Sequence, residues 1–278
     1  MPWVPRGRQC IKAIKQGDSL EFIHSNNYES RGISIEALIR GCLDKYPTTK
    51  DFSIEIETND VPVARPQGYD FSVTDKNYAK AFPCFFYDSW PQIGVNDYSH
   101  LINSFIDTTP ESNKVGWIGK EDVSNDRTEF LRLSEDAENN YYEAISNRWR
   151  RINPQELYKN TPTYLTYQQQ IDRWKYLIDF KGFGWSARTK VLLNSPRIVF
   201  IVDREYEEFW YEYIKPWVHY VPVKEDLSDL EKNYEKIESD TGLQEYIKTN
   251  QREFAKKYLT REAALLRIKK IIEEHEDC

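Results

Sequence analysis

Residues 176–188 read Tyr176-Leu-Ile-Asp-Phe-Lys-Gly-Phe-Gly-Trp-Ser-Ala-Arg188, and this stretch decides the fold that the sequence predicts. Its apolar start predicts a buried strand, and a helical pattern follows over 186–194. Between them, glycines let a backbone approach a diphosphate, and the start of a helix offers free N–H groups. Arg188 opposes the dipole of that helix, which makes sense if an anion lies between them. The alternative is a tight turn with a solvated arginine. The predicted backbone donors to a diphosphate are Gly182, Phe183, Gly184, Trp185, Ser186 and Ala187.

The pattern of strand followed by helix continues around this loop. Strands are predicted over 115–119, 176–180, 197–202 and 218–223. Helices are predicted over 128–151, 186–194, 205–214, 227–237, 243–258 and 260–274, the last with Thr260 as its N-cap. This alternation is typical of an α/β fold with a parallel sheet of the nucleotide-binding type.

The first part of the chain has a different pattern. Residues 52–58 alternate apolar and polar side chains, which predicts a strand with one buried face and places Asp60 just past its end. Helical spacing over 33–46 precedes it. The stretch 65–109 has no clear period and is rich in proline and aromatic residues. We therefore expect long aromatic loops that line a cleft.

Composition narrows the class of protein. The 278 residues, 40% of them hydrophobic, suffice for two modest domains. The net charge of −7 matches a polyanion poorly, so nucleic acid is not expected as a partner. Four cysteines without a Cys-x-x-Cys pair predict neither a disulfide framework nor a zinc site. Because no apolar run reaches the roughly 18 to 20 residues of a membrane span and no leader is apparent, we expect a cytoplasmic protein without a membrane span.

A dinucleotide-dependent dehydrogenase is the main alternative at this point. Asp203 follows the next predicted strand 21 positions after Gly182, where an acid that binds a ribose would lie. Against this, the glycine loop lies late in the chain, and Asp203 suits the N-cap of a helix equally well. The residues alone leave both interpretations open.

Three segments, 175–193, 207–211 and 215–230, resemble glycosyltransferase family 90. The run Lys215-Pro-Trp-Val-His-Tyr-Val-Pro-Val223 is the most specific of these likenesses. The family contains protein O-glucosyltransferases, capsule-associated xylosyltransferases and lipopolysaccharide-modifying enzymes. The resemblance implies a GT-B-like α/β fold with two Rossmann-type domains facing a central cleft and C-terminal helices that pack back toward the N-terminal domain. The implied parts are an acceptor-side domain at 1–112, a nucleotide-sugar domain at 113–245 and the returning helices at 246–278.

The resemblance also implies roles for individual residues. The family's general base falls on Asp60, and Pro62 keeps the motif, but Asn59 stands where the family has an arginine. Trp90 resembles an element near the donor sugar, with Asp88 and Ser89 beside it. The implied ligands of the nucleotide and its diphosphate, besides the glycine loop, are Gly119, Lys120, Arg127, Arg188 and, for the ribose, Glu208.

The implied reaction is an inverting transfer of a sugar from a UDP-sugar donor to a hydroxyl of a glycan acceptor, giving a β-linkage. It needs a base on the acceptor hydroxyl and positive charge on the departing diphosphate, which Asp60 and the arginines can supply. No strict Asp-x-Asp pair occurs, so neither a metal nor another cofactor is expected. The chain is more similar to viral or microbial members, which favours UDP-xylose and, if viral, the cytoplasm of a host. A UDP-glucose-dependent enzyme of the same family and a non-catalytic glycan-binding relative are the alternatives.

Overall fold

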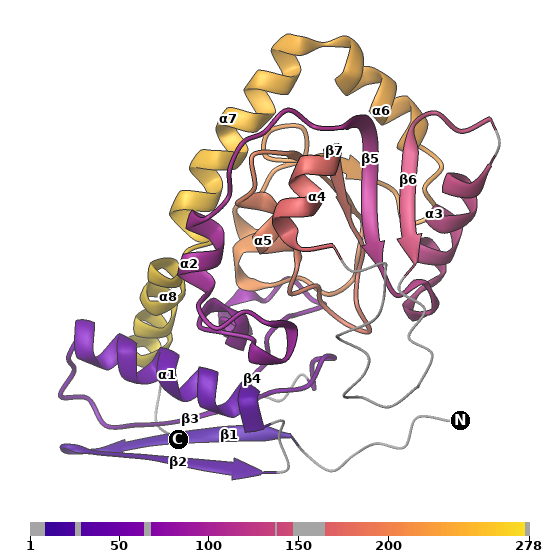
Figure 1. Cartoon of the computed structure of the whole chain (residues 1–278). Helices are drawn as coiled ribbons and strands as arrows, with labels where there is room; N and C mark the ends of the chain where they lie inside the picture. Colours follow the sequence, from indigo (N-terminus) through magenta and orange to yellow (C-terminus); the bar gives the residue numbers. More distant parts are fainter. Residues whose placement is uncertain (1–8, 26–28, 64–67, 137, 147–164, 276–278) are drawn as a thin grey trace. The chain divides into compact units, whose positions relative to one another are not determined.

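The structure is a computed structural model that describes residues 9–25, 29–63, 68–136, 138–146 and 165–275. Its α/β chain divides into two units, each built from segments that are distant in sequence (Figure 1). Unit 1 contains Met1–Ser104, Glu205–Tyr213 and Lys256–Cys278. Unit 2 contains Phe105–Arg204 and Ile214–Ala255.

Unit 2 is built on a five-stranded sheet with the order β6-β5-β7-β8-β9, and every neighbouring pair is parallel. Its strands are β5 (Ser112–Gly119), β6 (Tyr142–Ser146), β7 (Trp174–Asp179), β8 (Ile198–Val202) and β9 (Val221–Val223). All five residues of β8 are buried, as expected for a parallel strand covered on both faces. The predicted parallel sheet of an α/β fold is confirmed.

The helices of unit 2 differ in part from the prediction. They are α3 (Asn125–Glu135), α4 (Tyr167–Arg173), α5 (Thr189–Leu193), α6 (Leu230–Ser239) and most of α7 (Thr241–Tyr258), which continues into unit 1. The single helix predicted over 128–151 is wrong within the described residues, because α3 ends at Glu135 and β6 follows. Asn139 accepts hydrogen bonds from the backbone N–H groups of Tyr141 and Tyr142 at 2.8 and 2.9 Å, which turns the chain into that strand. Residues 147–151 lie outside the described residues.

Unit 1 contains a mixed four-stranded sheet with the order β2-β1-β3-β4. Its strands are β1 (Cys10–Gln16), β2 (Ser19–Ser25), β3 (Phe52–Glu57) and β4 (Gly68–Tyr69). The pairs β1/β2 and β1/β3 are antiparallel and only β3/β4 is parallel. A Rossmann-type sheet was predicted in both domains, so this half is a correction, whereas the strand over 52–58 is confirmed.

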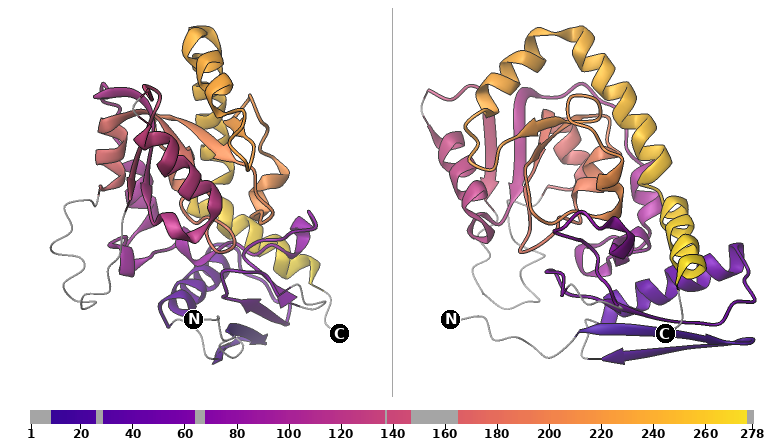
Figure 2. Two further views of the ribbon diagram at one scale, coloured as in Figure 1. Left: turned by 90° about the vertical axis from the view of Figure 1, so that its right-hand side faces the viewer. Right: turned by 180° about the vertical axis from the view of Figure 1, so that it is seen from behind.

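The C-terminal helix returns to the N-terminal part of the chain, as predicted. Within unit 1, α8 (Arg261–Glu274) packs against α1 (Glu29–Lys45), and Figure 2 shows the two side by side. Cys42 of α1 donates to the carbonyl of Leu265 at 3.4 Å. Thr260 caps α8 by accepting from the N–H of Ala263 at 3.1 Å, which confirms the predicted N-cap.

Two further predictions in unit 1 are corrected. The aromatic stretch over 65–109 was expected to line a cleft, but Phe85, Phe86 and Tyr87 are at most 1% exposed and pack as part of the core. The helix predicted over 205–214 is only the 3-10 turn Phe209–Glu212. Glu207 instead exchanges two backbone hydrogen bonds of 2.9 Å with Val73, which holds it in an extended bridge. Among the described residues, no helix combines the length and apolar character of a membrane span.

Candidate functional site

The carboxyl edge of the unit 2 sheet collects the predicted diphosphate residues. Strand β5 pairs with β6 on one side and with β7 on the other, so the strand order reverses between β5 and β7. Ligands of open α/β sheets bind outside the carboxyl ends of the strands at such a point. Gly119 ends β5, and the loop at Gly182 follows β7. The fold therefore brings two predicted segments, about 60 residues apart in the printed sequence, to one edge.

Arg188 bridges the two strands at this edge. Its Nη1 donates to the carbonyl of Ile118 in β5 at 2.7 Å, and its Nη2 donates to the carbonyl of Ile178 in β7 at 2.8 Å. Its Nε lies 3.2 Å from the carboxylate of Asp179. These bonds use three of its five N–H donors, so the guanidinium is fixed before any ligand binds.

Arg127 makes a second bridge, between the residues that follow β5 and β7. It donates to the carbonyl of Lys120 after β5 at 3.2 Å and to that of Lys181 after β7. Burial and the nearby charge of Arg188 lower the pKa of Arg127 to about 10. Its Nε is buried and has no acceptor among the described residues. A buried donor without a partner costs about 1 to 3 kcal/mol, which an additional acceptor at this edge would offset.

Asp179 is the central residue of the site, and no sequence pattern had indicated it. Its carboxylate is 1% exposed and accepts from Arg204 at 2.9 Å, from Arg188 at 3.2 Å and from the hydroxyl of Thr189 at 2.5 Å. Burial raises the pKa of Asp179, but the guanidiniums of Arg204 and Arg188 outweigh this and hold it below its usual value. The anion inferred beside Arg188 is thus, in the protein itself, a side chain. An aspartate inside an apolar strand was the signal that could have revealed it.

Three guanidiniums gather at this edge of the sheet. The charges of Arg188 and Arg204 lower the pKa of Arg127, and those of Asp179 and Asp126 raise it. Such a cluster attracts an anion and stabilises charge that develops on it.

The predicted glycine loop has the close approach that its pattern requires. A Cβ on Gly182 would lie 2.8 Å from the backbone carbonyl oxygen of Trp185. Phe183 is 67% exposed, whereas Trp185 is buried. The helix after the loop begins at Thr189, three residues later than predicted, and has five residues. So short a helix adds little dipole, and the arginines carry most of the positive charge.

We expect Gly182→Ala to destabilise unit 2 by about 1 to 3 kcal/mol, because an atom that meets a backbone oxygen forces the loop to shift. Gly242→Ala is the matched control, since the added Cβ would meet only the side chain of Asp240, at 3.3 Å. Urea unfolding of both variants measures the difference. Equal midpoints for the two variants would show that the close approach at Gly182 is unimportant.

The predicted base lies in unit 1. Asp60 follows β3, its side chain is 45% exposed, and its Oδ1 accepts from Nη2 of Arg31 at 2.8 Å. Arg31 comes from α1 and also donates to the carbonyl of Thr58 at 2.6 Å. The family motif has an arginine where this chain has Asn59, and here a guanidinium from another element pairs with the carboxylate. No local pattern could have revealed this partner, which is 29 residues away in sequence.

Contacts with α1 link the predicted sugar-binding residues to Arg31, the partner of this base. The guanidinium of Arg31 lies 5.0 Å from the ring centroid of Phe85, and that ring packs edge-on against Trp90 at 5.2 Å. Ser89 exchanges a hydrogen bond of 3.0 Å with Ser34 of α1. Asp88 lies 3.3 Å from Arg261 of α8. Contacts within unit 1 thus connect Asp60 and residues 88–90 through α1.

Glu208 is 1% exposed and belongs to unit 1, whereas the diphosphate residues belong to unit 2, so its ribose role stays a prediction. Burial, followed by the charge of Glu208, raises the pKa of Tyr87 well above its usual value. Cys10, Glu55 and Glu57 of unit 1 place possible metal ligand atoms within 4.8 Å of one another. None of these three is a predicted site residue.

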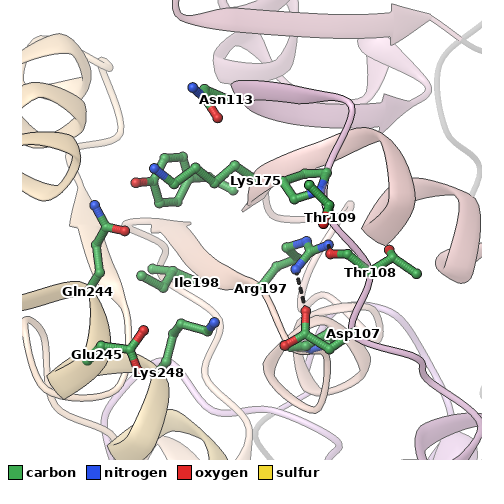
Figure 3. A pocket seen from close by; sticks show the side chains of 13 residues that line it. Asp107, Thr108, Thr109, Asn113, Lys175, Arg197, Ile198, Gln244, Glu245 and Lys248 are labelled. Carbon is green, nitrogen blue, oxygen red and sulfur yellow. Dashed lines mark hydrogen bonds and ion pairs between the residues drawn. The ribbon is translucent and has the colours of Figure 1, made fainter. Parts of the chain in front are cut away.

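A cavity of about 400 Å³ lies at the opposite edge of the unit 2 sheet (Figure 3). It is lined by residues at the amino ends of β7 and β8, by the segment before β5 and by the first turns of α7. Arg197, which pairs with Asp107 at 2.8 Å, forms one wall, and Gln244 and Lys248 form another. No predicted site residue lines this cavity. The predicted diphosphate residues lie instead at the carboxyl edge of the sheet.

A parallel sheet whose strand order reverses at such an edge is typical of nucleotide-binding α/β proteins, and an anchored, partly exposed carboxylate suits an enzyme of group transfer. The sequence model of glycosyl transferase family 90 matches residues 10–275. The chain belongs to glycosyl transferase family 90. This membership decides against the dehydrogenase.

Curated relatives share shorter stretches with the chain. Protein O-glucosyltransferase 1 of Rattus norvegicus is 41% identical over 75 residues, which are 27% of this chain and 19% of the relative. The Homo sapiens protein of that name is 36% identical over 87 residues, 31% of this chain and 22% of the relative. O-glucosyltransferase rumi of Drosophila melanogaster is 46% identical over 65 residues, 23% of this chain and 15% of the relative. The matches thus span between 15% and 22% of the length of these relatives.

Proposed function

We propose that this glycosyltransferase moves a sugar from a UDP-sugar donor to a hydroxyl of a glycan acceptor, with inversion and a β-linked product. The observation that carries the proposal is the pair of guanidiniums at the reversal point of the unit 2 sheet, where Arg127 and Arg188 are held in place by backbone carbonyls. Fixed cations at that position stabilise the charge of a departing diphosphate without reorganisation. The proposal requires neither a metal nor another cofactor.

The chemistry follows from the two sets of residues. Asp60 accepts the proton of the acceptor hydroxyl as its oxygen attacks the anomeric carbon, and the bond between that carbon and the UDP oxygen breaks. Arg127 and Arg188, with the backbone of the loop at Gly182, stabilise the diphosphate that leaves. The mechanism requires Asp60 and the arginines to act on one donor and acceptor pair. A GT-B-like arrangement of the two units would meet this requirement and is part of the proposal.

A thermal-shift panel tests the donor class. UDP is expected to raise the midpoint of thermal unfolding and NAD is not, because a ligand that binds only the folded state stabilises it. Arg188→Ala should reduce the shift caused by UDP. Stabilisation by NAD, without an effect of UDP, would contradict the proposal.

Xylose is the proposed donor sugar, and glucose is the second candidate because the relatives named above are O-glucosyltransferases. We expect kcat/KM for UDP-xylose to exceed that for UDP-glucose by about tenfold, the scale on which a pocket rejects one extra small group. Initial rates of UDP release with each donor and one acceptor measure the ratio. A higher value for UDP-glucose would replace xylose by glucose and leave the assignment as a glycosyltransferase intact.

A further inference from the structure

The two carboxylate oxygens of Asp60 have different surroundings. Oδ1 accepts from Arg31 at 2.8 Å, whereas Oδ2 has no hydrogen bond to any described residue. The side chain is 45% exposed. One oxygen is therefore anchored, and the exposed side chain leaves the carboxylate accessible to a hydroxyl that approaches from solvent.

Arg31 is itself held more tightly than an ordinary surface arginine. Its side chain is 11% exposed, it donates to the carbonyl of Thr58, and it lies over the ring of Phe85. Arg40 on the same helix offers a comparison, since it is 53% exposed and 3.8 Å from Glu36. Exposed ion pairs of that kind contribute little to folding stability, whereas a largely buried cation lowers stability unless it is paired.

A purely structural role does not account for this arrangement. The end of β3 is already held by Gln9, whose carbonyl accepts from the N–H of Thr58 at 2.8 Å and from its hydroxyl at 3.2 Å. The ion pair with Arg31 therefore orients the side chain of Asp60, which lies beyond that strand end. Orientation of a reacting group is worth much in rate, and a misplacement of 1 Å can cost about 100-fold.

We propose that Arg31 is the positioning residue of the base Asp60, and that it holds Oδ1 so that Oδ2 meets the acceptor hydroxyl. This inference rests on the proposed function of Asp60. Arg31 positions the carboxylate and takes no proton itself, and its fork reaches Asp60 and Thr58 together, which a lysine cannot do.

The test compares Arg31→Gln, Arg31→Lys, Asp60→Asn and the control Arg40→Gln. We expect Arg31→Gln to lower kcat by about 100-fold and to leave KM for the UDP-sugar and the UDP thermal shift unchanged. Arg31→Lys should lower kcat by only about tenfold, because one N–H can still reach Oδ1. Millimolar guanidinium should restore part of the rate of Arg31→Gln. Arg40→Gln should match the wild type.

Two results would overturn the inference. In the first, Arg31→Gln keeps a kcat within about twofold of the wild type while Asp60→Asn is inactive. In the second, both Arg31 variants lose thermal stability and donor affinity together with kcat, and guanidinium restores nothing, which would make Arg31 a structural residue only. Turnover retained in Asp60→Asn would instead refute the base assignment, so failure of the proposed function is seen in a different variant.

Discussion

Asp60→Asn is expected to lower kcat by about 1,000-fold while the affinity for UDP stays within about twofold of the wild type. An amide keeps the shape of the side chain and its hydrogen bond from Arg31 but cannot accept a proton at neutral pH. The donor should still bind, because the cations predicted to hold it lie in unit 2 and Asp60 lies in unit 1. The loss therefore appears in the chemical step and not in donor binding.

The measurement pairs initial rates with UDP titration by calorimetry on the same preparation. Asp44→Asn is the control, because it removes an exposed carboxylate of α1 in the same unit. Arg188→Ala gives the opposite pattern, in which the affinity for UDP itself falls. If Asp60→Asn turns over at the rate of Asp44→Asn, the base is another residue. If Asp60→Asn loses affinity for UDP as much as turnover, its role is in donor binding.

The unit 2 sheet could be predicted because its determinants are local. Runs such as Ile198–Val202 are apolar throughout, and turn residues separate them, so strand, loop and helix follow in a readable order. The position of the glycine loop after β7 follows from the same order. The helix predicted over 205–214 failed because Glu207 forms its backbone bonds with Val73, a partner more than 100 residues away that no local pattern reveals.

The sequence pattern also could not reveal which charged residues pair with one another at the site. Arg31 meets Asp60 through the packing of α1 near the end of β3, and Arg204 meets Asp179 through the pairing of β7 and β8. Sequence reasoning found the positive charge of Arg188 and inferred an anion beside it. The structure shows that Asp179 supplies that anion, so an anion beside Arg188 does not by itself indicate a bound ligand.

Asp179→Asn is expected to lower the free energy of unfolding by about 3 to 5 kcal/mol at pH 7, because it removes one partner of a buried ion pair. Arg204 is 2% exposed and would keep its charge after losing the carboxylate of Asp179, and Arg188 would lose the same carboxylate. Glu129→Gln, which removes an exposed ion pair with Arg132 in the same unit, should change stability little. Urea unfolding of both variants at pH 7 gives the comparison, and equal midpoints would refute a structural role for the buried pair.

The pH dependence of this stability difference distinguishes the loss of the Asp179 charge from a change in the shape of its side chain. The guanidiniums of Arg204 and Arg188 hold the pKa of Asp179 below its usual value, against the effect of burial. A carboxylate with a lowered pKa in the folded state contributes its full stability above the unfolded-state pKa of about 3.9 and loses it as the pH falls through the folded-state pKa. The difference between wild type and Asp179→Asn should therefore stay constant from pH 7 to about pH 4 and shrink below that. A difference that already shrinks between about pH 7 and pH 5 would mean that another titrating group, and not Asp179, is the source of the stability.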